Sequence, residues 1–151
     1  MAATYDNLGL QFLYPENWTI AEQSQGEMYS ASVTLQSPGT SCWTVHRYPS
    51  TCSQKQLVEQ LVAGMRKEYP ELEEEPFVVQ LAGEESRGVR IYFYYLDLLV
   101  SWCLTPITME GQVFLFEFQA EDQEFDEMES VFLALATSVL GNSPSSASET
   151  S

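Results

Sequence analysis

Alternating apolar and polar residues predict that most of this chain forms β-strands. The alternation has the two-residue period of a half-buried strand in seven places. Turn signals separate these runs, among them Ser37-Pro38-Gly39, the polar stretch 84–88 and Glu110-Gly111-Gln112. The acidic run 71–75 reads as a connector. We therefore expect strands within residues 8–20 (two short strands around a turn), 28–36, 41–47, 77–81, 89–97, 99–105 (with a break or bend near 106) and 113–119.

Two segments instead repeat their apolar residues every three or four positions, the period of an amphipathic helix. Ser53 has the side chain of an N-cap, Gln56 completes a capping box, and Pro70 stops the first helix. Asp122 begins the second helix and Gly141 ends it. The predicted apolar stripes are Leu57, Val58, Leu61, Val62 and Met65 on the first helix, and Phe125, Met128, Phe132, Leu135 and Val139 on the second.

The order of these elements favours an α+β fold with an antiparallel sheet. Hairpins are segregated from the two helices, whereas a doubly wound parallel sheet would alternate strand and helix. The run 89–97 is apolar on both faces, so we expect one helix on each face of the sheet, an α-β-α sandwich. A single domain is predicted over residues 1–140, and the polar segment 141–151 is predicted to be a disordered tail.

The first residues of the chain also suggest a family. The run Asn7-Leu8-Gly9-Leu10-Gln11-Phe12, followed by Tyr14-Pro15-Glu16-Asn17-Trp18, resembles the PsbP-like α-β-α sandwich superfamily. As a pattern of elements, the resemblance covers residues 5–140. It implies a domain that binds other proteins and is generally not catalytic.

That superfamily includes PsbP of photosystem II, a Ran-binding nuclear factor and small bacterial proteins of unknown function. Some of its bacterial members act as chaperones that sheath apolar helices of secreted effectors. The present chain lacks the characteristic opening of that subgroup, and no photosystem-binding or Ran-binding surface matches residue by residue. The resemblance therefore implies a protein-binding or chaperone-like accessory role without naming the partner.

Charge narrows the classes of partner. The chain has 151 residues, with 22 acidic and 6 basic side chains and a formal net charge of −16. This potential repels nucleic-acid backbones and anionic membranes, so we expect a protein partner, and a basic one if the binding is electrostatic. The first ten residues lack the pattern of a secretory signal, and no run is apolar enough to insert in a membrane, which predicts a cytoplasmic location.

The candidate protein-binding surface combines aromatic and acidic residues. Tyrosine and tryptophan carry a polar group on an apolar ring and are common in interfaces. Four consecutive aromatic residues at 92–95 point alternately to the two faces of their strand. Together with the neighbouring acidic run, they give the predicted surface residues Tyr92, Tyr94, Trp102, Glu73, Glu74 and Glu75.

An alternative is a small-molecule or enzyme site in a cleft of the sheet. Asp97 and Glu117 are the acids inside apolar strand runs, and a shared cleft would make them an acid–base pair. His46 lies near Cys42 and Cys52, but the spacing favours neither a catalytic dyad nor structural zinc. We therefore predict no catalytic residue, metal or cofactor.

Two further alternatives stay open in the sequence. A Cys42–Cys52 disulfide is allowed if the native compartment is oxidising. The chain is expected to be a monomer or a homodimer, the latter through an exposed edge strand such as 33–36.

Overall fold

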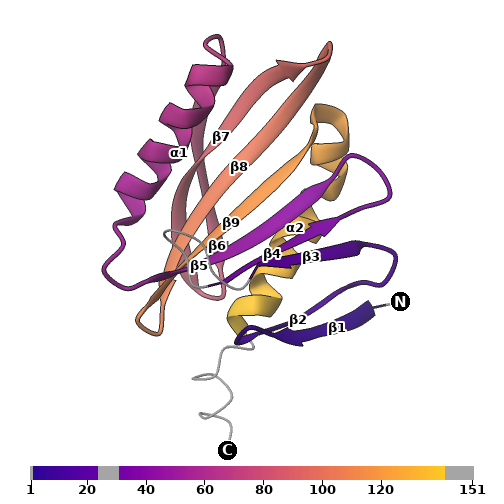
Figure 1. Cartoon of the computed structure of the whole chain (residues 1–151), viewed down its shortest axis with the longest axis vertical. Helices are drawn as coiled ribbons and strands as arrows, with labels where there is room; N and C mark the ends of the chain where they lie inside the picture. The colour runs from indigo at the N-terminus through magenta and orange to yellow at the C-terminus, as the bar shows by residue number, and fades with distance from the viewer. Residues whose placement is uncertain (1, 24–30, 142–151) are drawn as a thin grey trace, which may run out of the picture.

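The computed structural model describes residues 2–23 and 31–141 and is built on an antiparallel sheet with two helices, the α+β class (Figure 1). Seven strands lie in the order β3-β4-β5-β9-β8-β7-β6, and β1 and β2 form a separate two-stranded sheet. The elements are β1 (Ala2–Asn7), β2 (Leu10–Pro15), β3 (Thr19–Gln23), β4 (Ala31–Gln36), β5 (Cys42–Pro49), α1 (Gln54–Glu68), β6 (Glu73–Leu81), β7 (Glu84–Tyr95), β8 (Leu98–Met109), β9 (Gln112–Glu121) and α2 (Asp122–Gly141).

A strand is present in each region predicted from alternation, although residues 28–30 of the strand predicted at 28–36 lie outside the described residues, and several strands are longer than predicted. The acidic run 71–75 is not simply a connector, because Glu73–Glu75 already pair with β7. The polar run 84–88 is not a turn either, because it forms the first residues of β7. Both segments lie in the edge hairpin β6–β7, where polar side chains can point into solvent. The strand β1 was not predicted.

Four hairpins among the described residues are closed by tight turns. Each turn has two residues, and both of these residues have a positive φ, as a two-residue hairpin loop of type I′ requires. Three of the turns place glycine second: Leu8-Gly9, Ala82-Gly83 and Glu110-Gly111. The fourth, Leu96-Asp97 between β7 and β8, contains no glycine.

The predicted break at residue 106 does not occur, because β8 runs through Pro106. The pairing of β7 with β8 ends at Val89↔Leu104, so the missing N–H of Pro106 costs no bond in that ladder. The Pro106 carbonyl instead accepts a hydrogen bond from the Ser86 hydroxyl, at 2.6 Å. At Gly88 a Cβ atom would lie 1.8 Å from the Leu104 carbonyl oxygen, so only glycine fits this approach.

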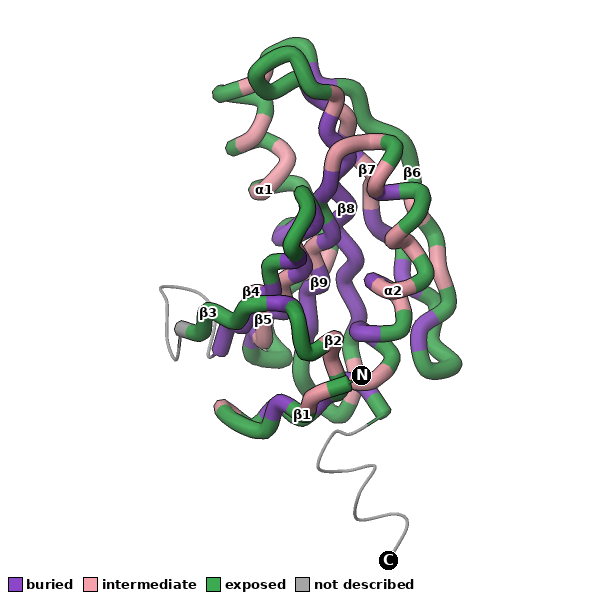
Figure 2. Tube along the Cα trace, turned by 90° about the vertical axis from the view of Figure 1, so that its right-hand side faces the viewer, coloured by how far each residue is buried: buried purple, intermediate pink, exposed green. Residues whose placement is uncertain are grey.

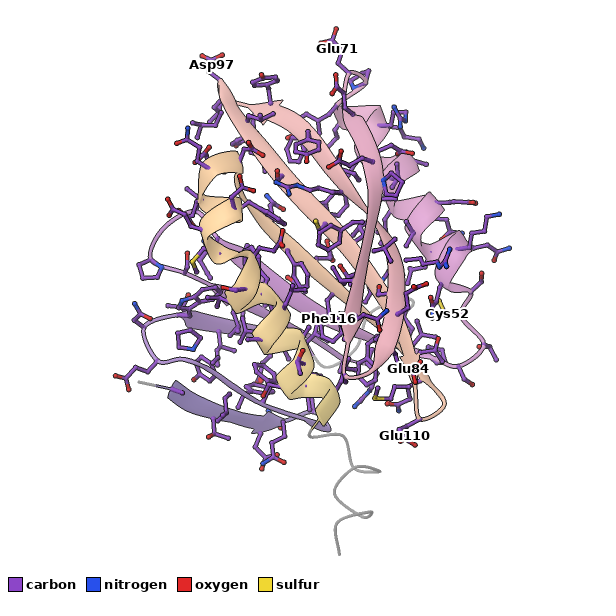
Figure 3. The ribbon with its side chains drawn as sticks, turned by 180° about the vertical axis from the view of Figure 1, so that it is seen from behind. Cys52, Glu71, Glu84, Asp97, Glu110 and Phe116 are labelled. Atoms are coloured by element: carbon purple, nitrogen blue, oxygen red, sulfur yellow. The ribbon has the colours of Figure 1, made fainter. Side chains whose placement is uncertain are left out.

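Two core clusters lie against the strand β9. Phe114, Phe116 and Phe118 alternate along β9 and belong to the cluster that contains α2. The intervening Val113 and Leu115 belong to the cluster that contains α1. Because neighbouring side chains of a strand point in opposite directions, we refer below to the α1 side and the α2 side of the sheet. Figures 1 and 3 show the sheet from these two sides.

Both helices use the predicted apolar stripes. Leu57 and Val58 of α1 are buried, and Leu61, Val62 and Met65 pack beside them. In α2, Phe125, Phe132, Leu135 and Val139 are buried, with Met128 packed against the same cluster. The Ser53 hydroxyl caps α1 by accepting a hydrogen bond from the Gln56 amide at 3.3 Å.

The expected edge strand at 33–36 is wrong, because β4 lies between β3 and β5. The outer strands of the seven-stranded sheet are β3 and β6. Of the tail predicted at 141–151, Gly141 is the last residue of α2 and the others lie outside the described residues.

Candidate protein-binding site

The hairpin β7–β8 extends past its neighbour β6 at one end of the molecule. Pairing of β6 with β7 begins at Glu73↔Tyr92, whereas β7 and β8 stay paired as far as Tyr95↔Leu98. Residues 93–95 of β7 therefore have β8 on one side and no β6 partner on the other. Figure 2 shows the consequence for burial, since β8 is buried along its middle and exposed where the hairpin turns.

The end of this hairpin is covered with large apolar side chains. Among the described residues, seven large hydrophobic side chains are exposed, and four of them lie within five consecutive positions. These four are Tyr94 (69% exposed), Tyr95 (53%), Leu96 (79%) and Leu98 (51%), which we call the hairpin tip. The other three lie on three different strands, β2, β3 and β6.

Leu96 also occupies an unfavourable backbone position. Its φ is 50° and that of Asp97 is 67°, in the left-handed region that asparagine and glycine normally supply in such turns. For other L-residues this region costs about 1–2 kcal/mol. Leu96 therefore combines an exposed apolar side chain with a costly backbone conformation. Residues in such conformations are frequent at functional sites, so the hairpin tip is a candidate site.

A cavity of about 690 Å³ opens beside the tip, between the end of α1, the start of β6 and the unpaired part of β7. We call it the end cavity. Its walls are aromatic, aliphatic and acidic, formed by Glu68, Tyr69, Pro70, Glu71, Leu72, Glu73, Tyr92, Phe93, Tyr94 and Leu99. Figure 3 shows Glu71 and Asp97 at this end of the molecule, with Glu84, Glu110 and Cys52 toward the other.

Ring packing holds the walls of the end cavity in place. The rings of Tyr69 and Phe93 lie with their centroids 4.5 Å apart. The Tyr92 hydroxyl donates a hydrogen bond to the Glu75 carboxylate at 2.6 Å. Burial, and then this bond to a carboxylate, raises the pKa of Tyr92 to about 12, so the hydroxyl stays protonated at neutral pH.

The charge of the end cavity is negative. Glu68, Glu71 and Glu73 contribute to its lining, and no lining residue is basic. The nearest cations in sequence, Arg66 and Lys67, line a different groove between α1 and the edge of the sheet. There Arg66 forms an ion pair with Glu74, with 3.2 Å between nitrogen and oxygen.

The structure brings together part of the surface predicted from sequence. Tyr92, Tyr94 and Glu73 line the end cavity, and Glu75 is bonded to Tyr92. Glu74 lies apart from them, beside Arg66.

Trp102 does not belong to this surface, because it is 6% exposed and packs in the core cluster on the α1 side. Its indole N–H donates to Glu117 at 2.9 Å. Alternation along a strand predicts which face a side chain such as Trp102 occupies, but not how far it lies from the exposed end of the strand.

The proposed cleft between Asp97 and Glu117 is absent from the described structure. Asp97 is an exposed turn residue, whereas Glu117 pairs with Leu104 on β8. Leu104 is six residues from the start of β8, which separates the two acids by roughly 20 Å at about 3.4 Å per residue. Glu117 instead contacts His46, with 2.5 Å between its oxygen and Nε2. The acid–base pair considered from sequence is therefore wrong.

The three cysteines are free. Cys42 begins β5 and Cys52 follows its last residue, Pro49, so the length of the strand separates the two thiols. This length, more than about 20 Å, far exceeds the approximately 7 Å limit between Cα atoms for a disulfide. A Cys42–Cys52 bridge is thus incompatible with the fold. Burial raises the pKa of both thiols and of Cys103.

The remaining classes of site are metal centres and membrane-spanning helices. Within residues 2–23 and 31–141, no three side chains of histidine, cysteine, aspartate or glutamate are grouped so that they could hold a metal ion. Neither of the helices described here is long and apolar enough to cross a membrane.

Tyr69, Leu96 and Leu98 were not among the predicted surface residues, and residue 96 was assigned to the strand predicted at 89–97. A signal was present: Asp97 is the one charged residue in the run 91–100, and aspartate favours turns. Because the pair Leu96-Asp97 contains no glycine, it was not predicted as a turn. Tyr69 and Pro70 were interpreted only as the end of the first helix.

Comparison with solved structures shows what this fold is similar to. The solution structure of cyanobacterial PsbP (CyanoP) from Synechocystis sp. PCC 6803 matches with a TM-score of 0.63 and 14% identity, over 91% of this chain and 90% of that one. LpqN, described as involved in cell envelope biogenesis of Mycobacterium tuberculosis, matches with a TM-score of 0.50 and 12% identity, over 90% of this chain and 87% of that one.

A third similar structure comes from Bacteroides thetaiotaomicron VPI-5482, with a TM-score of 0.55 and 14% identity. The match covers 86% of this chain but only 44% of that larger one. No protein-family model matches the chain, and no curated protein matches it in sequence. At these identities the similarity concerns the fold alone.

Proposed function

Starting from a chain with the PsbP-like fold, we propose that this protein is a non-catalytic accessory module that binds another protein through its hairpin tip. The observation that carries the proposal is the grouping of Tyr94, Tyr95, Leu96 and Leu98 on one exposed turn. Exposed apolar groups gathered in one place are typical of interaction surfaces, whereas single ones are normal.

The backbone of the turn supports the same conclusion. Asparagine and glycine would make this turn more favourable, as glycine does in the other three hairpins. Leucine at position 96 adds apolar surface to the tip at a cost in conformational energy, and a bound partner would cover that surface. Tyrosine at positions 94 and 95 is the residue type most suited to such a contact, because it is apolar, rigid and able to hydrogen-bond.

The test compares two variants in which exposed apolar side chains are replaced by polar ones at different places on the surface. The double variant Leu96→Asn/Leu98→Thr removes apolar surface at the tip, and Val78→Thr removes it from the edge strand β6, where Val78 is 53% exposed. Each variant and the wild type is immobilised and exposed to extract of the native organism, and retained proteins are identified by mass spectrometry. We expect a protein that the wild type and Val78→Thr retain and that the double variant loses.

Two results would overturn the proposal: retention of the same proteins by all three forms, or retention of none by the wild type. Analytical ultracentrifugation of the wild type and the double variant adds a second criterion. If the wild type is a dimer that the double variant converts to a monomer, a second copy of the chain occupies the tip. The proposal of a different protein partner would then be wrong.

A further inference from the structure

The end cavity beside the hairpin tip has the chemistry of a site for a cation. Aromatic faces attract a cation through the negative charge density of the ring, and four aromatic residues line this cavity: Tyr69 and Phe93 on the α1 side, and Tyr92 and Tyr94 on the other face of β7. Carboxylates supply the opposite charge, and Glu68, Glu71 and Glu73 also line the cavity. No lysine or arginine is among the residues that line it.

From this combination we infer that the end cavity binds a basic side chain, arginine in preference to lysine, on an extended segment of the partner protein. The inference rests on the proposed function and adds the chemistry of the contact. A guanidinium group stacks on aromatic faces and forms paired hydrogen bonds with carboxylates, which an ammonium group does less well.

Two features favour a peptide segment over a free small cation. Residues 93–95 of β7 have no β6 strand beside them, so an extended segment can lie along this edge with its backbone groups facing those of β7. Tyr94 lines the cavity and Leu96 follows two residues later on the hairpin tip, so their exposed side chains can contact apolar residues that flank the basic one.

The neighbouring charges are consistent with this occupant. Glu74 is already paired with Arg66 on the groove between α1 and β6, so it does not compete for the ligand. Arg90 lies 5.0 Å from the centroid of the Tyr92 ring and is ion-paired with Asp122 and Asp126 of α2, so one face of Tyr92 already has a cation, but Arg90 is not part of the cavity lining. The lining itself therefore keeps its negative charge.

The test uses three capped tripeptides in nuclear magnetic resonance titrations of the ¹⁵N-labelled full chain. Acetyl-Leu-Arg-Leu-amide is compared with the peptides in which citrulline or glutamate replaces arginine. Citrulline has nearly the shape of arginine without its charge. We expect the arginine peptide to shift the amide signals of Leu72, Tyr92 and Phe93, and to bind roughly tenfold more tightly than the citrulline peptide.

Charge variants locate the binding. Glu71→Gln/Glu73→Gln should weaken the arginine peptide roughly fivefold and leave the citrulline peptide unchanged. The matched control Glu84→Gln/Glu110→Gln removes the same charge at the other end of the molecule (Figure 3). Because exposed charges are screened beyond about 8 Å at physiological ionic strength, the control should change neither affinity.

Three results would overturn the inference: equal binding of the arginine and citrulline peptides, an equal effect of the two charge variants, or binding of N-methylguanidinium alone as tight as that of the arginine peptide. The last would indicate a small-cation site. These outcomes are separate from the proposed function, because loss of a partner in Leu96→Asn/Leu98→Thr can occur with no arginine preference at all. Conversely, arginine binding with unchanged partner retention would contradict the role of the tip.

Discussion

The aromatic row of β9 and the hairpin tip are two apolar segments with opposite surroundings. Phe114, Phe116 and Phe118 are at most 4% exposed, between the sheet and α2. Tyr94 and Tyr95 come from an equally aromatic run, yet both are more than half exposed. The difference arises because β9 lies between β5 and β8 over residues 112–119, which include all three phenylalanines, whereas the end of β7 extends past β6.

This difference distinguishes aromatic residues that stabilise the fold from aromatic residues that remain in contact with water. Burial of aromatic rings on β9 removes them from water and supplies a large share of the folding free energy. The same residue types at the tip remain in contact with water, so they contribute little to folding and are available to a partner. Substitutions in the two regions should therefore affect different measurements.

The largest expected effect is at the centre of the buried row. Phe116→Ala should lower the free energy of unfolding by about 3–5 kcal/mol, because Phe116 is fully buried and its removal leaves a cavity. Tyr95→Ala at the tip should change it by less than about 0.5 kcal/mol. Urea denaturation measures both, and a similar loss in the two variants would contradict the division between the regions.

A smaller effect is expected at Gly88, where β7 passes close to β8. Gly88→Ala should cost about 1–3 kcal/mol, since the added Cβ would meet the backbone oxygen of Leu104, which cannot move aside as a flexible side chain can. Gly64→Ala is the matched control, because no atom lies within 4 Å of the added Cβ on α1. The control should gain about 0.5–1 kcal/mol from the better helix propensity of alanine. Equal unfolding midpoints for both variants would show that the approach at Gly88 is not tight.

The loop between β4 and β5 is held against the start of α2 by hydrogen bonds to Glu124. The Glu124 carboxylate accepts hydrogen bonds from the Ser41 hydroxyl and from the Thr40 amide, the latter at 3.1 Å. Desolvation alone would raise the pKa of Glu124, but these bonds outweigh it and lower the pKa below its ordinary value. The stabilisation is thus present above the ordinary pKa of glutamate and is lost as the pH falls through the lowered value.

Glu124→Gln should therefore cost about 1 kcal/mol at pH 7, and the difference from wild type should shrink toward about pH 3. Paired urea denaturations at the two pH values measure this. Glu127→Gln, an exposed change on the same helix, should show a smaller loss at neutral pH. A Glu124→Gln deficit that stays constant with pH would contradict the role of the ionised carboxylate.

The smallest effect on stability is expected at the tip itself. Leu96→Asn should raise the free energy of unfolding by about 0.5 kcal/mol, because asparagine tolerates the left-handed backbone better than leucine. The same substitution should weaken partner binding. Urea denaturation beside the capture experiment tests both, and a clear loss of stability would show that Leu96 packs in the core.

Many local features of the fold could be predicted from particular residues. The Ser53 cap, the apolar stripe of α2 and the phenylalanine row of β9 each follow from a local pattern that one element must satisfy. Two wrong assignments came from charged runs: Glu73–Glu75 and 84–88 are strands because β7 pairs with β6 on the edge of the sheet. A pairing partner distant in sequence overrode the local preference for a turn.

The candidate site was predicted in part, for a related reason. Tyr92, Tyr94 and Glu73 were recognised by residue type, and they do meet at the end cavity. Trp102 has the same type and is buried, while Asp97 and Glu117 were placed together although they lie far apart. Residue type indicates what a side chain can do, but the register of the strands decides whether it is exposed and what lies beside it.

By itself, then, the amino-acid sequence determined the class of fold, the two helices and the abundance of aromatic and acidic groups. These properties depend on interactions between residues close in the chain, whose periods can be read directly. Only the tertiary structure decided that β7 extends past β6, that Leu96 lies exposed in a turn and that three glutamates and four aromatic residues line one cavity. The ends of paired strands depend on contacts between distant segments, and those contacts locate the surface that we propose for binding.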